Sequence, residues 1–361
     1  MKIRKYLLFI FIVFTLLSEG HSQTIHDVID RFLKEHNYFE KPENVWENYT
    51  LDMTIEAIIN YSIITSDKRY IKYVERFFHQ RGYCFSDTVD YRKIPFSDAY
   101  FLWYQFRKNG DFIAPYLYEG YRIKKELVKT KEGAICIHHQ GGNYLLIDYL
   151  QTYGTRMSRA GYLSGDTTFF EECVKQFELY RQLLKYEESG LYSQGRGWLE
   201  QPEKLSPSCW SRGQGWLIRG MVSSLEYLPE NSDYEKKIKS ILVDFADALI
   251  KKQDENGMWR TLPCKDLNES FPEVSGTALI AYNIARAYSE GYLTKMKYKK
   301  AAQKAVEGIK RFIYPDGSID NISPGPGPLR SVDEYKRKGN RNDKHGPPTV
   351  VYGMTVDYML D

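Results

Sequence analysis

The stretch ESGLYSQG at residues 188–195 is the third of five similar segments in the chain. Each segment follows a helical pattern, reaches a glycine through a polar turn, and continues into a short extended run. The other four are QRGYCFSD (80–87), KEGAICIHH (131–139), ENGMWRTL (255–262) and PDGSIDN (315–321). Successive glycines lie 51, 57, 67 and 60 residues apart, close to the length of two helices with their loops. A repeat of this period is typical of stacked or closed arrays of supersecondary units.

Amphipathic helical patterns fill the stretches between these segments. Ahead of Gly190, apolar side chains recur three or four residues apart, at Phe170, Val174, Phe177, Tyr180 and Leu184. The same spacing runs through residues 238–250 ahead of Gly257, and no run of regularly spaced strands is present. The sequence therefore predicts an all-α fold with room for about six helical hairpins.

A closed ring of hairpins would bring the glycine turns, which are equivalent parts of successive units, to one end. The residues just after the glycines would then converge on a common site. These residues are His138 and His139, Gln194, Arg260 and Thr261, and Asp320. The alternative is an open helical solenoid or a generic α domain.

The first 22 residues have the pattern of a secretory signal peptide. A basic start precedes an apolar run from Tyr6 to Leu17, which is too short to span a bilayer as a stable anchor. We therefore expect a secreted or periplasmic protein without a membrane anchor after cleavage, and residues 23–361 as a single domain. Removing the peptide lowers the formal net charge from +3 to +1, so we expect no nucleic-acid partner.

Motifs for cofactors are absent from the sequence, which has no dinucleotide-binding or phosphate-binding glycine loop, no HExxH and no EF-hand loop. His138 and His139 are adjacent in an extended run, so their side chains point to opposite sides and a two-histidine chelate is disfavoured. We expect no metal and no cofactor. The five cysteines are scattered and odd in number, which favours buried thiols over a disulfide framework.

Asp148 follows Leu145, Leu146 and Ile147 and precedes a helical pattern, so its carboxyl lies at the edge of apolar surface. Burial raises the pKa of a carboxyl and favours the protonated form, which a general acid near neutral pH needs. An aspartate in this position is also a common helix N-cap, and both interpretations stay open from the residues alone.

The segment SPSCWSRGQGW (206–216) combines flat aromatic faces with a cation. Trp210 and Trp216 offer stacking surfaces for a sugar, and the Arg212 guanidinium matches the geometry of a carboxylate. Gly213 and Gly215 allow a turn or a close approach to a ligand. Such a segment suits an acidic sugar; the alternative is a packed turn in which Arg212 makes a structural ion pair.

Three segments resemble the unsaturated glycuronyl and rhamnogalacturonyl hydrolases of glycoside hydrolase families 88 and 105. They are CWSRGQGW (209–216), FPEVSGTALIAYNIARAYSEGYL (271–293) and IDYLQTYGTRMSRAGYLSGD (147–166). The resemblance covers roughly residues 45–315 and implies an (α/α)6 barrel. It also implies an enzyme that hydrates the C4=C5 double bond of a 4,5-unsaturated uronic acid, the non-reducing end of oligosaccharides made by polysaccharide lyases.

The resemblance also implies roles for single residues. Asp148 would be the general acid and base, and a second upstream aspartate would be Asp90, with Asp98 as the alternative. The three residues Trp210, Arg212 and Trp216 would bind the uronate and its ring.

Some positions depart from the family's pattern. Gln194 falls where rhamnogalacturonyl members often have histidine, and His138 and His139 stand near a His-Lys pair of the family. We assign these three residues to substrate binding. The C-terminal stretch from residue 322 differs from the family's glycine-rich ending, and His345 lies within reach of a divergent site there.

Two other functions are compatible with the residues. One is hydrolysis of saturated glycosides on the same barrel, with Asp148 paired to Asp90 or Asp98. The other is a catalytically silent sugar-binding protein that keeps Trp210 and Arg212 but lacks a working acid.

Overall fold

The computed structural model describes residues 24–35, 45–80, 114–139, 142–198, 201–265, 270–325, 327–338 and 344–360. The expected signal peptide, the segment around Gly82 and both upstream aspartates, Asp90 and Asp98, lie outside these residues. The cleavage of a leader and the identity of the second carboxylate therefore stay predictions. No helix in the described ranges combines the length and apolarity needed to cross a membrane.

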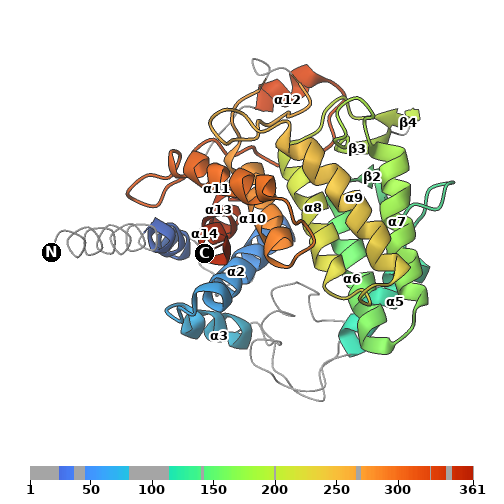
Figure 1. Ribbon diagram of the computed structural model, residues 1–361, viewed down its shortest axis with the longest axis horizontal. Coiled ribbons are helices and arrows are strands. Elements are labelled where there is room, and N and C mark those ends of the chain that lie inside the picture. Colours follow the sequence, from blue (N-terminus) through green and yellow to red (C-terminus); the bar gives the residue numbers. More distant parts are fainter. Residues whose placement is uncertain are drawn as a thin grey trace.

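Helices of the described ranges alternate along the chain between an inner and an outer layer (Figure 1). The inner layer contains α2 (Val45–Thr65), α6 (Tyr149–Ser164), α8 (Ser211–Leu225), α10 (Val274–Ser289) and α13 (Gly346–Met354). The outer layer contains α3 (Ile71–Gln80), α5 (Ala114–Glu126), α7 (Thr168–Leu184), α9 (Asp233–Ile250) and α11 (Met296–Lys310). Two short helices, α12 (Val332–Lys338) and α14 (Val356–Leu360), lie near the C-terminus.

The composition of each helix explains its layer. Nearly every residue of α10 is buried, including polar Ser275, Thr277 and Asn283, because other helices surround it. On α11, by contrast, burial is confined to one stripe that includes Tyr298, Ala302 and Val306. A helix that is apolar all round belongs inside, whereas a one-sided stripe covers the outside of a core.

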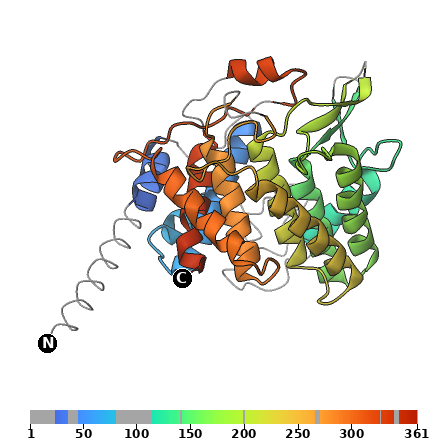
Figure 2. The ribbon, with the colours of Figure 1, turned by 45° about the horizontal axis from the view of Figure 1, so that its top comes forward.

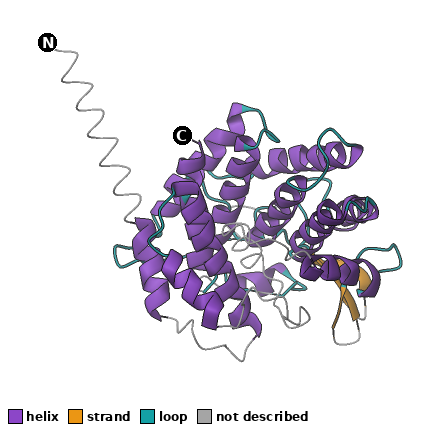
Figure 3. Cartoon of the chain, turned by 90° about the horizontal axis from the view of Figure 1, so that it is seen from below, coloured by secondary structure: helices purple, strands orange, loops and turns teal. Residues whose placement is uncertain are grey.

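Among the described inner helices, α6 packs on α8, α8 on α10, α10 on α13, and α13 on α2. The first and last of them along the chain, α2 and α13, are therefore neighbours, whereas the two ends of an open solenoid lie far apart. The fold is the (α/α)6 barrel that the sequence predicts (Figure 3).

One small antiparallel sheet interrupts the all-α pattern. Its strands are β1 (Ile137–His139), β2 (Gly142–Leu146), β3 (Gly195–Trp198) and β4 (Gln201–Leu205), in the order β1-β2-β3-β4. Leu145 pairs with Arg196, which joins the extended runs after the second and third glycine segments. The sequence predicted these runs as extended but did not predict that they form a sheet.

The predicted repeat is visible as a recurrent turn. Gly133, Gly190, Gly257 and Gly317 all have positive φ, between 70° and 92°. In each turn the glycine N–H donates to a carbonyl three or four residues earlier, and an antiparallel backbone bond closes the turn around it. A Cβ at Gly257 would lie 2.2 Å from a backbone oxygen of α11, so only glycine fits there.

Backbone hydrogen bonds link the runs after these turns in succession around the ring. Ile147 N–H donates to the Gln194 carbonyl at 3.1 Å, and Gln194 N–H donates to the Ser208 carbonyl at 3.0 Å. Ser211 N–H then donates to the Thr261 carbonyl at 3.0 Å. The turns therefore gather at one end of the barrel, and the sheet and α12 lie at the same end (Figures 1 and 2).

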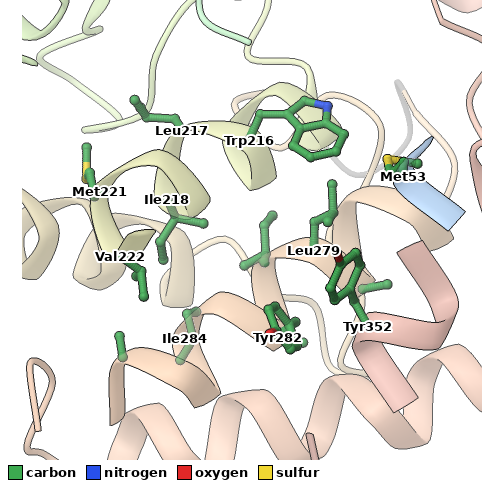
Figure 4. Packing of buried hydrophobic residues seen from close by; sticks show 14 of the residues in the cluster. Met53, Trp216, Leu217, Ile218, Met221, Val222, Leu279, Tyr282, Ile284 and Tyr352 are labelled. Carbon is green, nitrogen blue, oxygen red and sulfur yellow. The ribbon is translucent and has the colours of Figure 1, made fainter. Parts of the chain in front are cut away.

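The core between α8, α10 and α13 is apolar and closely packed (Figure 4). Leu279 of α10 lies so near α8 that a Cβ at Gly215 would be 2.7 Å from it. Of the cysteines in the described ranges, Cys136, Cys173 and Cys209 are buried and Cys264 is partly buried, and all four are free thiols. The sequence-based expectation of buried thiols is thus confirmed for three of them.

Candidate active site

Asp148 lies between the end of β2 and the first turn of α6. Asp148 occupies the N-cap position of α6, but its side chain makes no capping hydrogen bond to the helix. The Oδ1 atom is buried and has no hydrogen-bond partner among the described residues. Burial raises the pKa of Asp148 to about 7, an effect that the Arg212 charge and a backbone hydrogen bond partly oppose. A carboxyl of this kind is half protonated near neutral pH.

Gly213 brings α8 against this carboxyl. A Cβ at position 213 would lie 2.9 Å from Ile147 Cγ2 and 3.1 Å from Asp148 Oδ1. Both Gly213 and Gly215 lie inside α8, where they permit close helix packing, so the prediction that they form a turn is wrong.

Arg212 is almost fully buried, with 1% of its surface exposed. Its Nη1 donates to Ser275 Oγ at 2.8 Å and to the Ser323 carbonyl at 2.7 Å. The Nη2 atom is buried without a hydrogen-bond partner among the described residues. Among the described residues, no carboxylate lies within ion-pair distance of Arg212. The structural ion pair that the sequence left open is therefore not found within them. The Nη1 end of the guanidinium is therefore fixed, and the Nη2 end has no acceptor among the described residues.

Glu273 supports Arg212 from behind, and the sequence did not single out this residue. Its carboxyl accepts hydrogen bonds from both the N–H and the hydroxyl of Ser275 and from Ser323 N–H. It also accepts from Ser211 Oγ and Gly276 N–H. Because Ser275 and Ser323 in turn accept from Arg212, this buried carboxyl fixes the guanidinium through two intermediaries.

The two tryptophans occupy different places. Trp210 is only 2% exposed, its ring centre lies 4.4 Å from the Arg212 guanidinium carbon, and its Nε1 donates to Ser323 Oγ at 3.1 Å. It forms a wall behind the arginine. Trp216 lies one helical turn after Arg212 on α8, with Leu279 of α10 below its ring and Met53 of α2 opposite (Figure 4). Trp210 therefore contacts Arg212, whereas the guanidinium carbon over the Trp216 ring, 5.6 Å from its centre, is that of Arg219.

Gln194 is buried under the C-terminal segment. The Tyr335 hydroxyl of α12 donates to Gln194 Oε1 and also pairs with Ser206 Oγ at 2.7 Å. Burial raises the pKa of Tyr335 to about 12, and the nearby charge of Asp148 adds to this shift. The sequence gave no local signal for Tyr335, which lies 141 residues from Gln194.

The other predicted residues are less central. His138 lies exposed on β1, where its Nδ1 is 2.8 Å from Asn143 Oδ1, and the side chain of His139 lies outside the described residues. Arg260 donates to the Ser270 carbonyl at 2.5 Å. Within the described ranges, no group of three or more His, Cys, Asp or Glu side chains has the arrangement of a metal site.

The C-terminal segment reaches the arginine as well. Ser323 accepts from Arg212, and a Cβ at Gly325 would lie 3.6 Å from Arg212 Nη2 and 3.4 Å from His345 Cε1. His345 is thus near the guanidinium, as the sequence suggested. Of the residues proposed for the site, Asp148, Trp210, Arg212 and Gln194 come together.

An acid of raised pKa beside a fixed guanidinium, at the turn end of an (α/α)6 barrel, is an arrangement suited to acting on acidic sugars, and the protein is a glycoside hydrolase. More specifically, the chain belongs to Glycosyl Hydrolase Family 88, whose family model matches residues 24–358.

Curated relatives agree with this family. The chain is 29% identical over 191 residues to the unsaturated rhamnogalacturonyl hydrolase YesR of Bacillus subtilis, covering 53% of this chain and 52% of that protein. It is 25% identical over 175 residues to an unsaturated 3S-rhamnoglycuronyl hydrolase of Alteromonas sp., covering 47% of this chain and 42% of that protein. The matches thus span about half the length of these relatives.

Solved structures show the same fold. A possible member of GH105 family from Salmonella enterica superposes with a TM-score of 0.76 at 23% identity, covering 94% of both chains. A second structure, an unsaturated glucuronyl hydrolase specific for heparin, gives a TM-score of 0.67 at 15% identity, covering 94% of this chain and 96% of that one. At these identities the likeness establishes the barrel and leaves the substrate open.

Proposed function

We propose that this protein removes a 4,5-unsaturated uronic acid from the non-reducing end of oligosaccharides that polysaccharide lyases produce. The observation that carries the proposal is a pair of buried atoms that have no hydrogen-bond partner among the described residues, Asp148 Oδ1 and Arg212 Nη2, in side chains close enough for the Arg212 charge to act on the carboxyl. One is a proton source near neutral pH and the other is a donor for a carboxylate. The names of the curated relatives support the same class of substrate.

In the proposed reaction, the protonated carboxyl of Asp148 delivers its proton to C4 of the unsaturated ring. Positive charge then develops at C5 and the ring oxygen, next to the carboxylate that Asp148 has become. That carboxylate accepts a proton from a water molecule, and the water oxygen bonds to C5. The resulting hemiketal opens and releases the neighbouring sugar, so one water is consumed and Asp148 regains its proton.

Arg212 would bind the carboxylate that C5 carries. Its Nη1 is held by Ser275 and Ser323, so the guanidinium cannot turn away, and Nη2 is positioned to donate to one carboxylate oxygen. Trp210 keeps one face of the guanidinium dry, which strengthens a charge-assisted hydrogen bond. We further propose Asp90 as the second carboxylate, with Asp98 as the alternative, and a role for Trp216, Gln194 and the histidines at 138 and 139 in sugar binding.

The decisive experiment measures loss of the ultraviolet absorbance of the conjugated C4=C5 bond, using lyase digests of several uronate polysaccharides. Asp148→Asn should abolish turnover, because the amide cannot supply a proton. The control is Asp166→Asn, two residues beyond the other end of α6, where the exposed carboxyl accepts hydrogen bonds from the N–H and hydroxyl of Thr168. Full activity of Asp148→Asn would refute the assigned acid. Turnover of a saturated aryl glycoside alone would refute the reaction.

A secreted or periplasmic location is part of the proposal, because the first 22 residues have a signal-peptide pattern. Mass spectrometry of the protein purified from its native host should find an N-terminus near residue 23. An intact N-terminus would refute this location.

A further inference from the structure

Arg212 Nη2 is a hydrogen-bond donor for which the described residues provide no acceptor. The side chain is 99% buried, Nη1 has two acceptors, and Nη2 has none among the described residues. Leaving a charged donor unpaired in a buried place is costly, so a ligand that accepts this hydrogen bond recovers that cost. The direction in which Nη2 points therefore marks a binding position.

Gly325 shows what surrounds that position. A Cβ built on Gly325 would lie 3.6 Å from Arg212 Nη2, 3.4 Å from His345 Cε1 and 3.9 Å from His345 Nε2. The backbone at Gly325 is not in the left-handed region, so the conformation itself does not demand glycine. None of these contacts is short enough to exclude a methyl group. The lack of a side chain at 325 therefore leaves space between the guanidinium and the imidazole.

The backbone of His345 is fixed by its helix. His345 is the residue before α13, its carbonyl accepts from Thr349 Oγ1 at 2.7 Å, and its ring makes no capping bond. Since α13 packs on α10 and on α2, the imidazole is held beside Arg212 by the barrel itself. A ring N–H and a guanidinium N–H around one small space form an environment for an anion.

We infer that the C-terminal segment completes the carboxylate site, with Arg212 Nη2 and the His345 ring binding the two oxygens of the uronate carboxylate in the space beside Gly325. This inference rests on the proposed function. C5 carries the carboxylate, so fixing both oxygens also fixes the plane of the C4=C5 bond. Gly213, the residue after Arg212, lies against the Asp148 carboxyl, and the Arg212 charge acts on that carboxyl, so the proton source adjoins the carboxylate site. His345 is thus a substrate-binding residue contributed by the part of the chain that departs most from the family's pattern.

The test uses four variants of the full chain, assayed on an unsaturated uronate disaccharide. His345→Leu should raise KM about ten- to a hundredfold, the range for losing a hydrogen bond to a charged group, with a smaller change in kcat. His345→Gln should recover part of the affinity, because its amide can donate. Gly325→Ala should raise KM similarly by filling the space. The matched control is Gly327→Ala in the same loop, where a Cβ would meet nothing within 4 Å and KM should not change.

The carboxylate itself provides the second measurement. On the methyl ester of the same disaccharide, wild type and His345→Leu should have equal KM, because the negative charge is gone. Wild-type KM in both His345→Leu and Gly325→Ala on the free acid would overturn the inference while leaving the proposed function standing. If wild type turns over no unsaturated oligosaccharide, the proposed function fails. Calorimetry with glucuronate then tests the site alone, and equal affinity in wild type and His345→Leu would overturn the inference.

Discussion

Replacing Asp148 by asparagine should change the pH dependence of stability in a direction opposite to that of an ordinary surface carboxylate. Burial raises the pKa of Asp148 from 3.8 to about 7 in the folded protein. The folded state therefore holds this proton more tightly than the unfolded state. At about 1.4 kcal/mol for each pH unit between the two pKa values, the ionised carboxyl destabilises the fold by about 4 kcal/mol above pH 7. Wild type therefore keeps these roughly 4 kcal/mol of stability below about pH 4 and loses them as the pH rises through about 7.

Asparagine cannot ionise, so the variant does not suffer this loss. Its buried amide costs about 1–3 kcal/mol at every pH, because it replaces the carboxyl without a better partner. The free energy of unfolding of the variant minus that of wild type should therefore rise by about 4 kcal/mol in total between pH 4 and 8. The variant should be inactive and yet more stable than wild type at pH 8.

Urea unfolding at half-unit steps of pH measures this difference, and contributions from all other groups cancel in the subtraction. Asp166→Asn is the control, because hydrogen bonds from the Thr168 hydroxyl and amide lower the pKa of Asp166. Its difference curve should be nearly flat above about pH 5 and should slope the other way at more acid pH. Parallel stability curves for wild type and Asp148→Asn would show that the carboxyl is not held in its protonated form by burial.

Three further outcomes are expected. Gly213→Ala should reduce kcat at least tenfold by displacing Asp148. By contrast, Gly161→Ala, whose Cβ would lie 2.5 Å from Phe170 Cε1 near the other end of α6, should cost only about 1–3 kcal/mol of stability; equal activities of the two variants would contradict this. Cys264 should react with iodoacetamide at pH 7.5 before Cys173. Hydrogen bonding with Cys209 lowers the pKa of Cys264 to about 7, whereas burial raises the pKa of Cys173 to about 12. Peptide mass spectrometry that shows the reverse order would contradict this assignment. Tyr335→Phe should cost about 1–3 kcal/mol and increase hydrogen exchange in α12, because buried acceptors and donors lose the hydroxyl; unchanged protection there would contradict it.

Most of the fold was predicted from local patterns in the sequence. A glycine that follows an amphipathic helical pattern is a short, local signal, so five copies at a similar spacing predicted the hairpin array, and the four described glycines do have positive φ. Asp148 was accessible for the same reason, because the apolar run before it and the helix after it are adjacent in the chain. Its burial and its lack of a capping role then required the structure.

The parts that sequence reasoning missed depend on contacts between distant residues. Ser323 lies 111 residues from Arg212, and no periodicity in the sequence predicts that its carbonyl accepts a hydrogen bond from the guanidinium. Glu273 was visible only as one letter of a motif, although it accepts five hydrogen bonds. For Gly213 and Gly215 the sequence predicted a turn or a close approach to a ligand, because glycine permits turns and close packing alike; the helices around α8 show that close packing is the reason. The strands were missed because each has three to five residues.

The packing of α13 between α10 and α2 has a consequence for how the protein is made. Synthesis proceeds from the N-terminus, so the apolar surfaces of α2 and α10 that pack against α13 stay exposed until residues 346–354 have left the ribosome. His345 immediately precedes that same helix, so the packing of the inner helices and the proposed carboxylate site are completed together. A nascent chain that lacks this helix therefore exposes apolar surface and should be both aggregation-prone and inactive.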